Sequence, residues 1–168
     1  MNRFIPRNMP AQNAKILLID DDAEIRYSLD RVLSQDGHEV IAADSGEDGI
    51  QKAKELKPSL IFLDNRMGGI SGIETLQHLR SAAPDSMVIL MTAYGTTQTA
   101  IEAMKHGAFD YVLKPFDLNK LKEMVGRALQ ASKDAIGSHE QYKRLLDSSD
   151  YAEGIVGSGE NMQQVLKK

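Results

Sequence analysis

Residues 15–22 decide the fold: they read Lys15-Ile-Leu-Leu-Ile-Asp-Asp-Asp22, a short apolar run that ends in three aspartates. An apolar run of this length between polar residues is typical of a strand buried on both faces. The same design returns at 59–64, which read Ser59-Leu-Ile-Phe-Leu-Asp64. Strands of this kind occur in parallel sheets that are covered by helices. The two stretches therefore predict a buried parallel sheet in which acidic residues end the strands.

Outward from these runs, apolar stretches of strand length alternate with stretches of helical periodicity. The first predicted helix covers 23–35, and Gly37 marks its end. The other expected strands are 38–43, 87–91 and 109–113, and the other expected helices run from Ser45 to Pro58, from Gly72 through Leu79, over 97–105 and from about Leu118. Five strand–helix repeats predict an α/β fold with a doubly wound, five-stranded parallel sheet.

The composition indicates one globular domain with an appendage. The chain has 168 residues, of which 42% are hydrophobic and 26% charged, close to the average of globular proteins. It has no cysteine, which excludes disulfides and thiolate metal sites and fits a cytoplasmic location. No apolar run approaches the roughly 18 residues of a membrane helix, and no secretory signal is recognisable. With a net charge of −4 and no basic cluster, this chain itself is not expected to bind nucleic acid or a membrane.

Side chains suited to phosphoryl transfer stand at the ends of successive predicted strands. In chain order they are Asp20 and Asp21, Asp64, Thr92 and Lys114. In a doubly wound sheet, groups at the carboxyl ends of the strands gather at one edge. Clustered carboxylates are unfavourable unless a cation or protons compensate their charge. Hard oxygen ligands suit Mg²⁺, and Mg²⁺ beside a lysine and a hydroxyl suits a phosphoryl group.

Residue type suggests a role for each member of this set. Asp64 can act as the nucleophile and form an acyl phosphate. Asp21 and Asp64 would ligate the metal directly, and Asp20 would hold it through a water molecule. Lys114 would pair with one phosphoryl oxygen, and Thr92 would donate its hydroxyl to another. Any one of these residues alone is better explained as a helix cap or a surface charge, but their joint occurrence at strand ends points to a site.

Residues 15–130 resemble the receiver domains of two-component response regulators. The resemblance rests on Leu-Ile-Asp20-Asp21-Asp, Phe-Leu-Asp64, Met-Thr92-Ala and Leu-Lys114-Pro115-Phe, with Asp64 43 residues after Asp21 and 50 before Lys114. It implies a flavodoxin-like sheet with strand order 2-1-3-4-5 and a sensor histidine kinase that phosphorylates Asp64 in a phosphorelay requiring Mg²⁺. It also implies that the backbone carbonyl of Arg66 ligates the metal and that the Lys114–Pro115 peptide is cis.

The resemblance further implies a conformational switch. Thr92 would move toward the phosphoryl group and Tyr111 would rotate into the vacated space, changing the face formed by the fourth helix, fifth strand and fifth helix. Ala93 would give access to the acceptor, and Arg66 and Tyr94 would flank it and slow hydrolysis of the phosphorylated Asp64. Receivers usually have proline after the methionine that follows the acceptor, and Gly68 replaces it here. The loop is therefore expected to have more backbone freedom.

Two further stretches resemble the NtrC-type subgroup, which comprises sigma-54-dependent transcription activators. They are Ala93–Thr96 with Ala100–Tyr111, and the tail Gly154–Leu166, which is similar to the opening of an AAA+ ATPase domain. No phosphate-binding loop is present, so the chain is expected to be a regulatory phosphoacceptor rather than an enzyme. The expected parts are a flexible N-terminal extension (1–14), the receiver domain (15–131), a helical linker (132–150) and the start of a truncated AAA+ domain (151–168).

The last predicted helix could pair two chains. Mostly apolar residues recur at alternating spacings of three and four from Leu118 to Leu146, which is typical of a coiled coil. The alternative is a solvated linker helix that frays near Gly137. A homodimer is expected through this linker, through the face that includes the fifth strand, or through both. The alternative functions are an interaction module without transcriptional output, a flavodoxin-like or phosphatase enzyme, and a receiver that has lost phosphorylation.

Overall fold

The computed structural model describes residues 13–93 and 97–147. In these residues strands and helices alternate along the chain, as the sequence predicts. The strands are β1 (Lys15–Ile19), β2 (Glu39–Ala43), β3 (Leu60–Asp64), β4 (Met87–Thr92) and β5 (Asp110–Leu113). The helices are α1 (Ala23–Gln35), α2 (Gly46–Leu56), α3 (Gly72–Ala82), α4 (Thr97–Lys105) and α5 (Leu118–Asp147).

The strands form one parallel sheet in the order β2-β1-β3-β4-β5, which confirms the predicted doubly wound, flavodoxin-like topology. The register aligns the carboxyl ends of the central strands, since Ile19 pairs with Leu63 and Asp64 pairs with Met91. The order along the sheet reverses between β1 and β3, so the connections from these two strands leave toward opposite faces. A cleft forms where adjacent connections diverge in this way.

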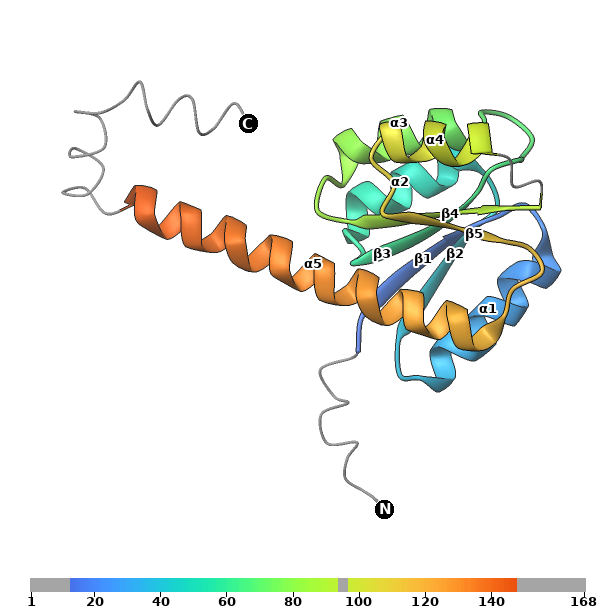
Figure 1. Ribbon diagram of the computed structural model, residues 1–168, viewed down its shortest axis with the longest axis horizontal. Coiled ribbons are helices and arrows are strands. Elements are labelled where there is room, and N and C mark those ends of the chain that lie inside the picture. Colours follow the sequence, from blue (N-terminus) through green and yellow to red (C-terminus); the bar gives the residue numbers. More distant parts are fainter. Residues whose placement is uncertain (1–12, 94–96, 148–168) are drawn as a thin grey trace, which may run out of the picture. The chain divides into compact units, whose positions relative to one another are not determined.

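Helices cover both faces of the sheet, with α2, α3 and α4 on one side and α1 and α5 on the other (Figure 1). Alternate strand residues supply the two cores, because successive side chains of a strand point to opposite faces. Leu17 and Ile19 pack with Leu76 on the first face. Ile16 and Leu18 pack in the core that includes Leu29, Leu33, Leu121 and Val125 on the second face. The central strands are therefore apolar on both faces up to their carboxyl ends, where Asp64 ends β3 and Thr92 ends β4.

Capping side chains fix the starts of three helices. Asp22, Ser45 and Ser71 accept hydrogen bonds from backbone N–H groups in the first turns of α1, α2 and α3, and each such cap stabilises a helix by about 1 kcal/mol. The chain reverses after α1 and α4 at Gly37 and Gly107, where φ is +93° and +95°. Only glycine adopts these angles without strain.

Helix α5 differs in part from each of the two interpretations of the linker. It continues without a break to Asp147, so the predicted fraying near Gly137 is wrong for the backbone. Most of the first half of the expected coiled-coil seam is not free to pair with a second chain. Leu121, Val125, Ala128 and Ser132 are buried within the domain. The apolar periodicity there reflects packing against the sheet. The side chains of the seam beyond Ile136 lie outside the described residues, so pairing through that segment stays a prediction.

The chain divides into two compact units, residues 1–132 and 133–168. The first contains the sheet and its helices, and the second contains the rest of α5. Most of the predicted N-terminal extension and all of the predicted AAA+ start (151–168) lie outside the described residues. Among the described helices, none combines the length and the apolar character that crossing a bilayer would require.

Candidate functional site

Three carboxylates meet at the carboxyl edge of the sheet. Asp20 directly follows β1 and Asp64 ends the neighbouring β3, and the two side chains are 1% and 5% exposed as residues. Asp21, in the turn after β1, is exposed. One oxygen from each carboxylate can be chosen so that all three lie within 4.8 Å of one another. The structure thus brings together the acidic residues that the sequence predicted.

The ammonium group of Lys114 lies between the two buried carboxylates. Its Nζ donates to Asp20 Oδ2 at 2.9 Å and to Asp64 Oδ1 at 3.0 Å. The backbone N–H of Lys114 continues the β4–β5 pairing by donating to the carbonyl of Thr92 at 2.8 Å. The Lys114–Pro115 peptide is cis, as the resemblance implied. Residues from three different strand ends therefore form one charged cluster.

The turn after β1 is held by contacts that sequence reasoning missed. The backbone N–H of Asp22 donates to Asp20 Oδ1 at 2.9 Å, and Asp22 itself caps α1. Arg26 Nη1 donates to the backbone carbonyl of Asp20 at 2.6 Å. Nothing in the sequence distinguishes Arg26 from an ordinary surface arginine, because its partner is a backbone atom whose position depends on the turn.

The charges in the cluster are only partly balanced. The pKa of Asp64 is raised from 3.8 to about 6, chiefly by burial; the hydrogen bond and the charge of Lys114 lower this pKa in part, and the charges of Asp20 and Asp21 raise it. Burial alone would lower the pKa of Lys114, but its hydrogen bonds to Asp20 and Asp64 outweigh burial and raise it above its ordinary value. The lysine therefore stays charged, while Asp64 still carries a net cost for its own negative charge.

A cavity of about 210 Å³ opens over these groups, and it is lined by Asp20, Asp21, Asp22, Asp64, Arg66, Ala93 and Lys114. Its opening gives the Asp64 carboxylate a path to solvent. The residues expected to flank the acceptor, Arg66 and Ala93, are among those that line it. Tyr94 lies outside the described residues.

The two residues of the expected switch lie near the cavity without lining it. Thr92 is 1% exposed at the end of β4, and Tyr111 in β5 pairs with Leu90 and is 37% exposed. Neither is among the residues that line the cavity. The structure thus places them on the strands between the site and the α4–β5–α5 side, and their roles stay predictions.

Glycine at position 72 sets how closely α3 approaches the backbone of Asp64. A Cβ atom at Gly72 would lie 2.6 Å from Asn65 Cα and 2.7 Å from the backbone oxygen of Asp64. The N–H of Gly72 donates to the carbonyl of Asn65 at 3.1 Å, and the N–H of Asn65 donates to Met91 in β4. The backbone that carries Asp64 is therefore clamped between α3 and β4.

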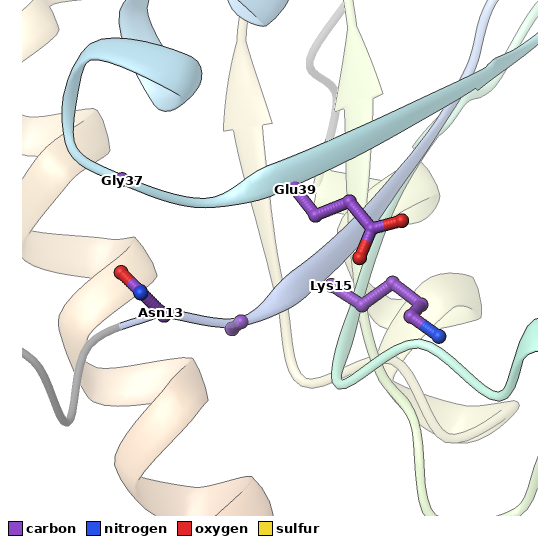
Figure 2. Close-up of a pocket in the computed structure, with 5 residues that line it drawn as sticks. Asn13, Lys15, Gly37 and Glu39 are labelled. Carbon is purple, nitrogen blue, oxygen red and sulfur yellow. The ribbon is translucent and has the colours of Figure 1, made fainter.

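Another cavity, of about 290 Å³, lies at the opposite, amino ends of β1 and β2. Figure 2 shows Asn13 and Gly37 toward one end of it and Lys15 and Glu39 toward the other. It contains one lysine and one glutamate and no cluster of acids. Among the described residues, only Asp20, Asp21 and Asp64 group in a way that could hold a metal ion.

The sequence has many relatives among curated proteins. Regulatory protein AtoC of Escherichia coli strain K12 is 40% identical over 116 residues, which cover 69% of this chain and 25% of AtoC. Transcriptional regulatory protein ZraR of the same organism is 32% identical over 160 residues, which cover 95% of this chain and 35% of ZraR. The chain thus spans between 25% and 35% of the length of these relatives.

Solved structures that resemble this chain also include response regulators. NtrX from Brucella abortus, in complex with ADP, superposes with a TM-score of 0.72 at 30% identity, covering 77% of this chain and 30% of NtrX. A response regulator receiver domain protein from Clostridium thermocellum superposes with a TM-score of 0.68 at 34% identity, covering 71% of this chain and 97% of that one.

The similarity to AtoC, ZraR and NtrX confirms the resemblance to NtrC-type regulators that the sequence indicated. The family model named response regulator receiver domain matches residues 16–126, which include every strand of the sheet and the whole acidic cluster. On this match and this geometry, the chain belongs to the response regulator receiver domain family.

Proposed function

We propose that Asp64 is the phosphoacceptor of a two-component response regulator and that its phosphorylation controls a downstream sigma-54-dependent transcription activator. The observation that carries the proposal is the pairing of buried Asp64 with Lys114 at 3.0 Å, beside two further aspartates and under an open cavity. A carboxylate meant only for structure would not be expected to share one cation with a second buried carboxylate and face solvent. Receiver domains take their phosphoryl group from histidine kinases, and a sensor histidine kinase is the proposed donor.

The residues present fit a divalent cation. Ligand oxygens of three carboxylates gather within 4.8 Å of one another, and Lys114, which is hydrogen-bonded to two of these carboxylates, supplies a single positive charge beside them. Asp21 and Asp64 would bind Mg²⁺ directly, the backbone carbonyl of Arg66 would complete the set, and Asp20 would hold the ion through a water molecule. All of these donors are hard oxygens, the ligands that Mg²⁺ prefers. When bound, Mg²⁺ would neutralise charge on the transferred phosphoryl group.

In the proposed reaction an Asp64 carboxylate oxygen attacks the phosphorus of a phosphohistidine on the kinase. The new P–O bond forms an acyl phosphate as the P–N bond breaks, and the bonding pair leaves with the imidazole nitrogen. Lys114, already 3.0 Å from Asp64, moves its hydrogen bond to a phosphoryl oxygen. Thr92 donates its hydroxyl to another phosphoryl oxygen. Arg66, Ala93 and Tyr94 control how easily the donor and water reach the acceptor.

The output is proposed to pass through the face formed by α4, β5 and α5. On this side, large apolar side chains are exposed on adjacent elements: Ile101 and Met104 on α4, Tyr111 and Leu113 on β5, and Leu118 on α5. Exposed apolar side chains that gather on adjacent elements favour pairing of two copies. Movement of Thr92 and Tyr111 on phosphorylation would alter this face, so that homodimerisation through it or through the linker follows the state of Asp64. Similarity to the regulatory proteins AtoC and ZraR supports a transcriptional output.

A small phosphodonor tests the acceptor. The protein is incubated with acetyl phosphate and Mg²⁺, and intact mass is compared for wild type, Asp64→Ala and the control Asp85→Ala. Asp85 is an exposed aspartate before the amino end of β4, away from the cluster. We expect one phosphoryl group on wild type and on the control, and none on Asp64→Ala. An unmodified wild type, or modification that survives loss of Asp64, would contradict the proposal.

The second step is tested separately. Size-exclusion chromatography with and without beryllofluoride and Mg²⁺ reports whether occupation of the acceptor changes the association state. We expect a shift for wild type and none for Asp64→Ala. Equal elution of wild type under both conditions would remove the proposed link from Asp64 to dimerisation while leaving the acceptor role intact.

A further inference from the structure

The loop between β3 and α3 touches the acidic cluster at one backbone atom. The N–H of Gly68 donates to Asp21 Oδ2 at 3.4 Å. Of the three clustered carboxylates, Asp21 is the exposed one. Asp20 and Asp64 are both buried and both bonded to Lys114. The Gly68 contact thus reaches the one carboxylate of the cluster that burial does not fix in place.

An exposed aspartate side chain samples several rotamers, and only some of them direct an oxygen into the cavity. A hydrogen bond to one oxygen restricts this freedom and still leaves lone pairs free, because a carboxylate offers about four acceptor sites. The Gly68 contact is longer than the usual 2.7–3.2 Å of an N–H···O bond. It is therefore expected to bias the position of the carboxylate and not to lock it.

We propose that the Gly68 backbone N–H is a positioning group that holds Asp21 over the cavity before a cation binds there. The inference rests on the proposed function, since the benefit of a fixed Asp21 is a preformed Mg²⁺ site. Gly68 acts through Asp21 and need not touch the ion or the phosphoryl group. The identity of residue 68 then matters through its backbone donor, which proline lacks and every other residue supplies.

The chain allows a matched pair of variants at this position. A Cβ atom at Gly68 would meet nothing within 4 Å, and the φ angle of Gly68 is outside the left-handed region. Gly68→Ala therefore keeps the N–H, adds no clash and reduces loop freedom. Gly68→Pro also reduces loop freedom but removes the N–H. A difference in Mg²⁺ affinity between the two variants measures the contribution of the N–H donor. A change in affinity that both variants share measures the effect of loop flexibility.

The first measurement is the affinity of the unphosphorylated protein for Mg²⁺, from an NMR titration of backbone amide signals around the cavity. We expect Gly68→Pro to weaken binding about two- to five-fold, the effect of losing one weak hydrogen bond, and Gly68→Ala to bind like wild type. Equal affinities for the proline and alanine variants, or tighter binding by the proline variant, would overturn the proposal.

The second measurement needs neither the metal nor a proline variant, so it decides the question even if Gly68→Pro fails to fold. In the metal-free protein, the amide proton of Gly68 should move upfield in Asp21→Ala, which removes the acceptor, while that of Gly126 on α5 stays in place. An unmoved Gly68 signal would refute the contact. Failure of acetyl phosphate to modify wild type would instead refute the proposed function, and the amide result would be unaffected.

Discussion

Replacing Asp64 by asparagine should make the metal-free protein more stable at neutral and alkaline pH. The buried carboxylate has a pKa raised from 3.8 to about 6, so the folded protein binds this proton more tightly than the unfolded chain does. The unfavourable contribution of the charge is absent below the unfolded value, grows as the pH rises from 3.8 to about 6, and is complete above that. Asparagine has the same shape and carries no charge.

The size of the effect follows from the shift. A difference of about 2 pKa units corresponds to about 3 kcal/mol when Asp64 is fully ionised. Asparagine also weakens the bond that Lys114 makes to Asp64 at 3.0 Å, which offsets part of the gain because charge-assisted bonds contribute about 1.5–3 kcal/mol. The expected net gain is about 1–2 kcal/mol near pH 8, and it falls by about 1.4 kcal/mol, to about zero, near pH 5.

Urea unfolding with EDTA at several pH values, followed by circular dichroism, measures the free energy of unfolding for wild type, Asp64→Asn and the control Asp85→Asn. The exposed Asp85 lies outside the cluster, so its removal should change stability little at any pH. Adding Mg²⁺ should reduce the difference in the free energy of unfolding between Asp64→Asn and wild type, because the cation compensates the charge of Asp64 in wild type. A variant no more stable than wild type at pH 8, or a gain that does not change with pH, would refute the electrostatic reasoning.

Three further substitutions test the close approach of α3 to Asp64, the stability of α5 and the shielding of the cavity. Gly72→Ala should destabilise the protein by about 1–3 kcal/mol and slow modification of Asp64 by acetyl phosphate, because the added methyl would push on the backbone of Asp64 and Asn65; unchanged urea midpoint and rate would contradict this. Gly126→Ala should stabilise it by about 0.5–1 kcal/mol, since an exposed helical glycine with free space around it gains from a side chain; a lower urea midpoint would count against it. Arg66→Ala should speed the loss of phosphate from Asp64 a few-fold, because Arg66 lines the cavity, and a decay rate equal to that of wild type would exclude a shielding role.

Much of the site could be predicted because it depends on strand ends. Asp20 and Asp64 each stand where a buried apolar run stops, Lys114 stands at the end of the partly exposed β5, and in a parallel sheet such points lie along one edge. The acidic cluster and its lysine were therefore predictable before any coordinates, as was the order of elements.

Helix α5 shows the limit of periodicity. The spacing of Leu121, Val125 and Ala128 fits a coiled coil as well as a helix packed on a sheet, because both need one apolar stripe. In the structure these residues are buried against the strands. Sequence pattern identifies an apolar face, and it does not identify what covers that face.

By itself, then, the sequence determined the α/β fold and which carboxylates and lysine meet at one edge, because these follow from local periodicity and from the alignment of parallel strands. Tertiary structure alone decided the contacts of Arg26 with the Asp20 carbonyl, of Gly68 with Asp21, and of Gly72 with the acceptor backbone. Each of these joins a side chain or a glycine to a backbone atom of another element. Backbone atoms are the same in every residue, so only the folded path of the chain reveals which of them a given residue meets.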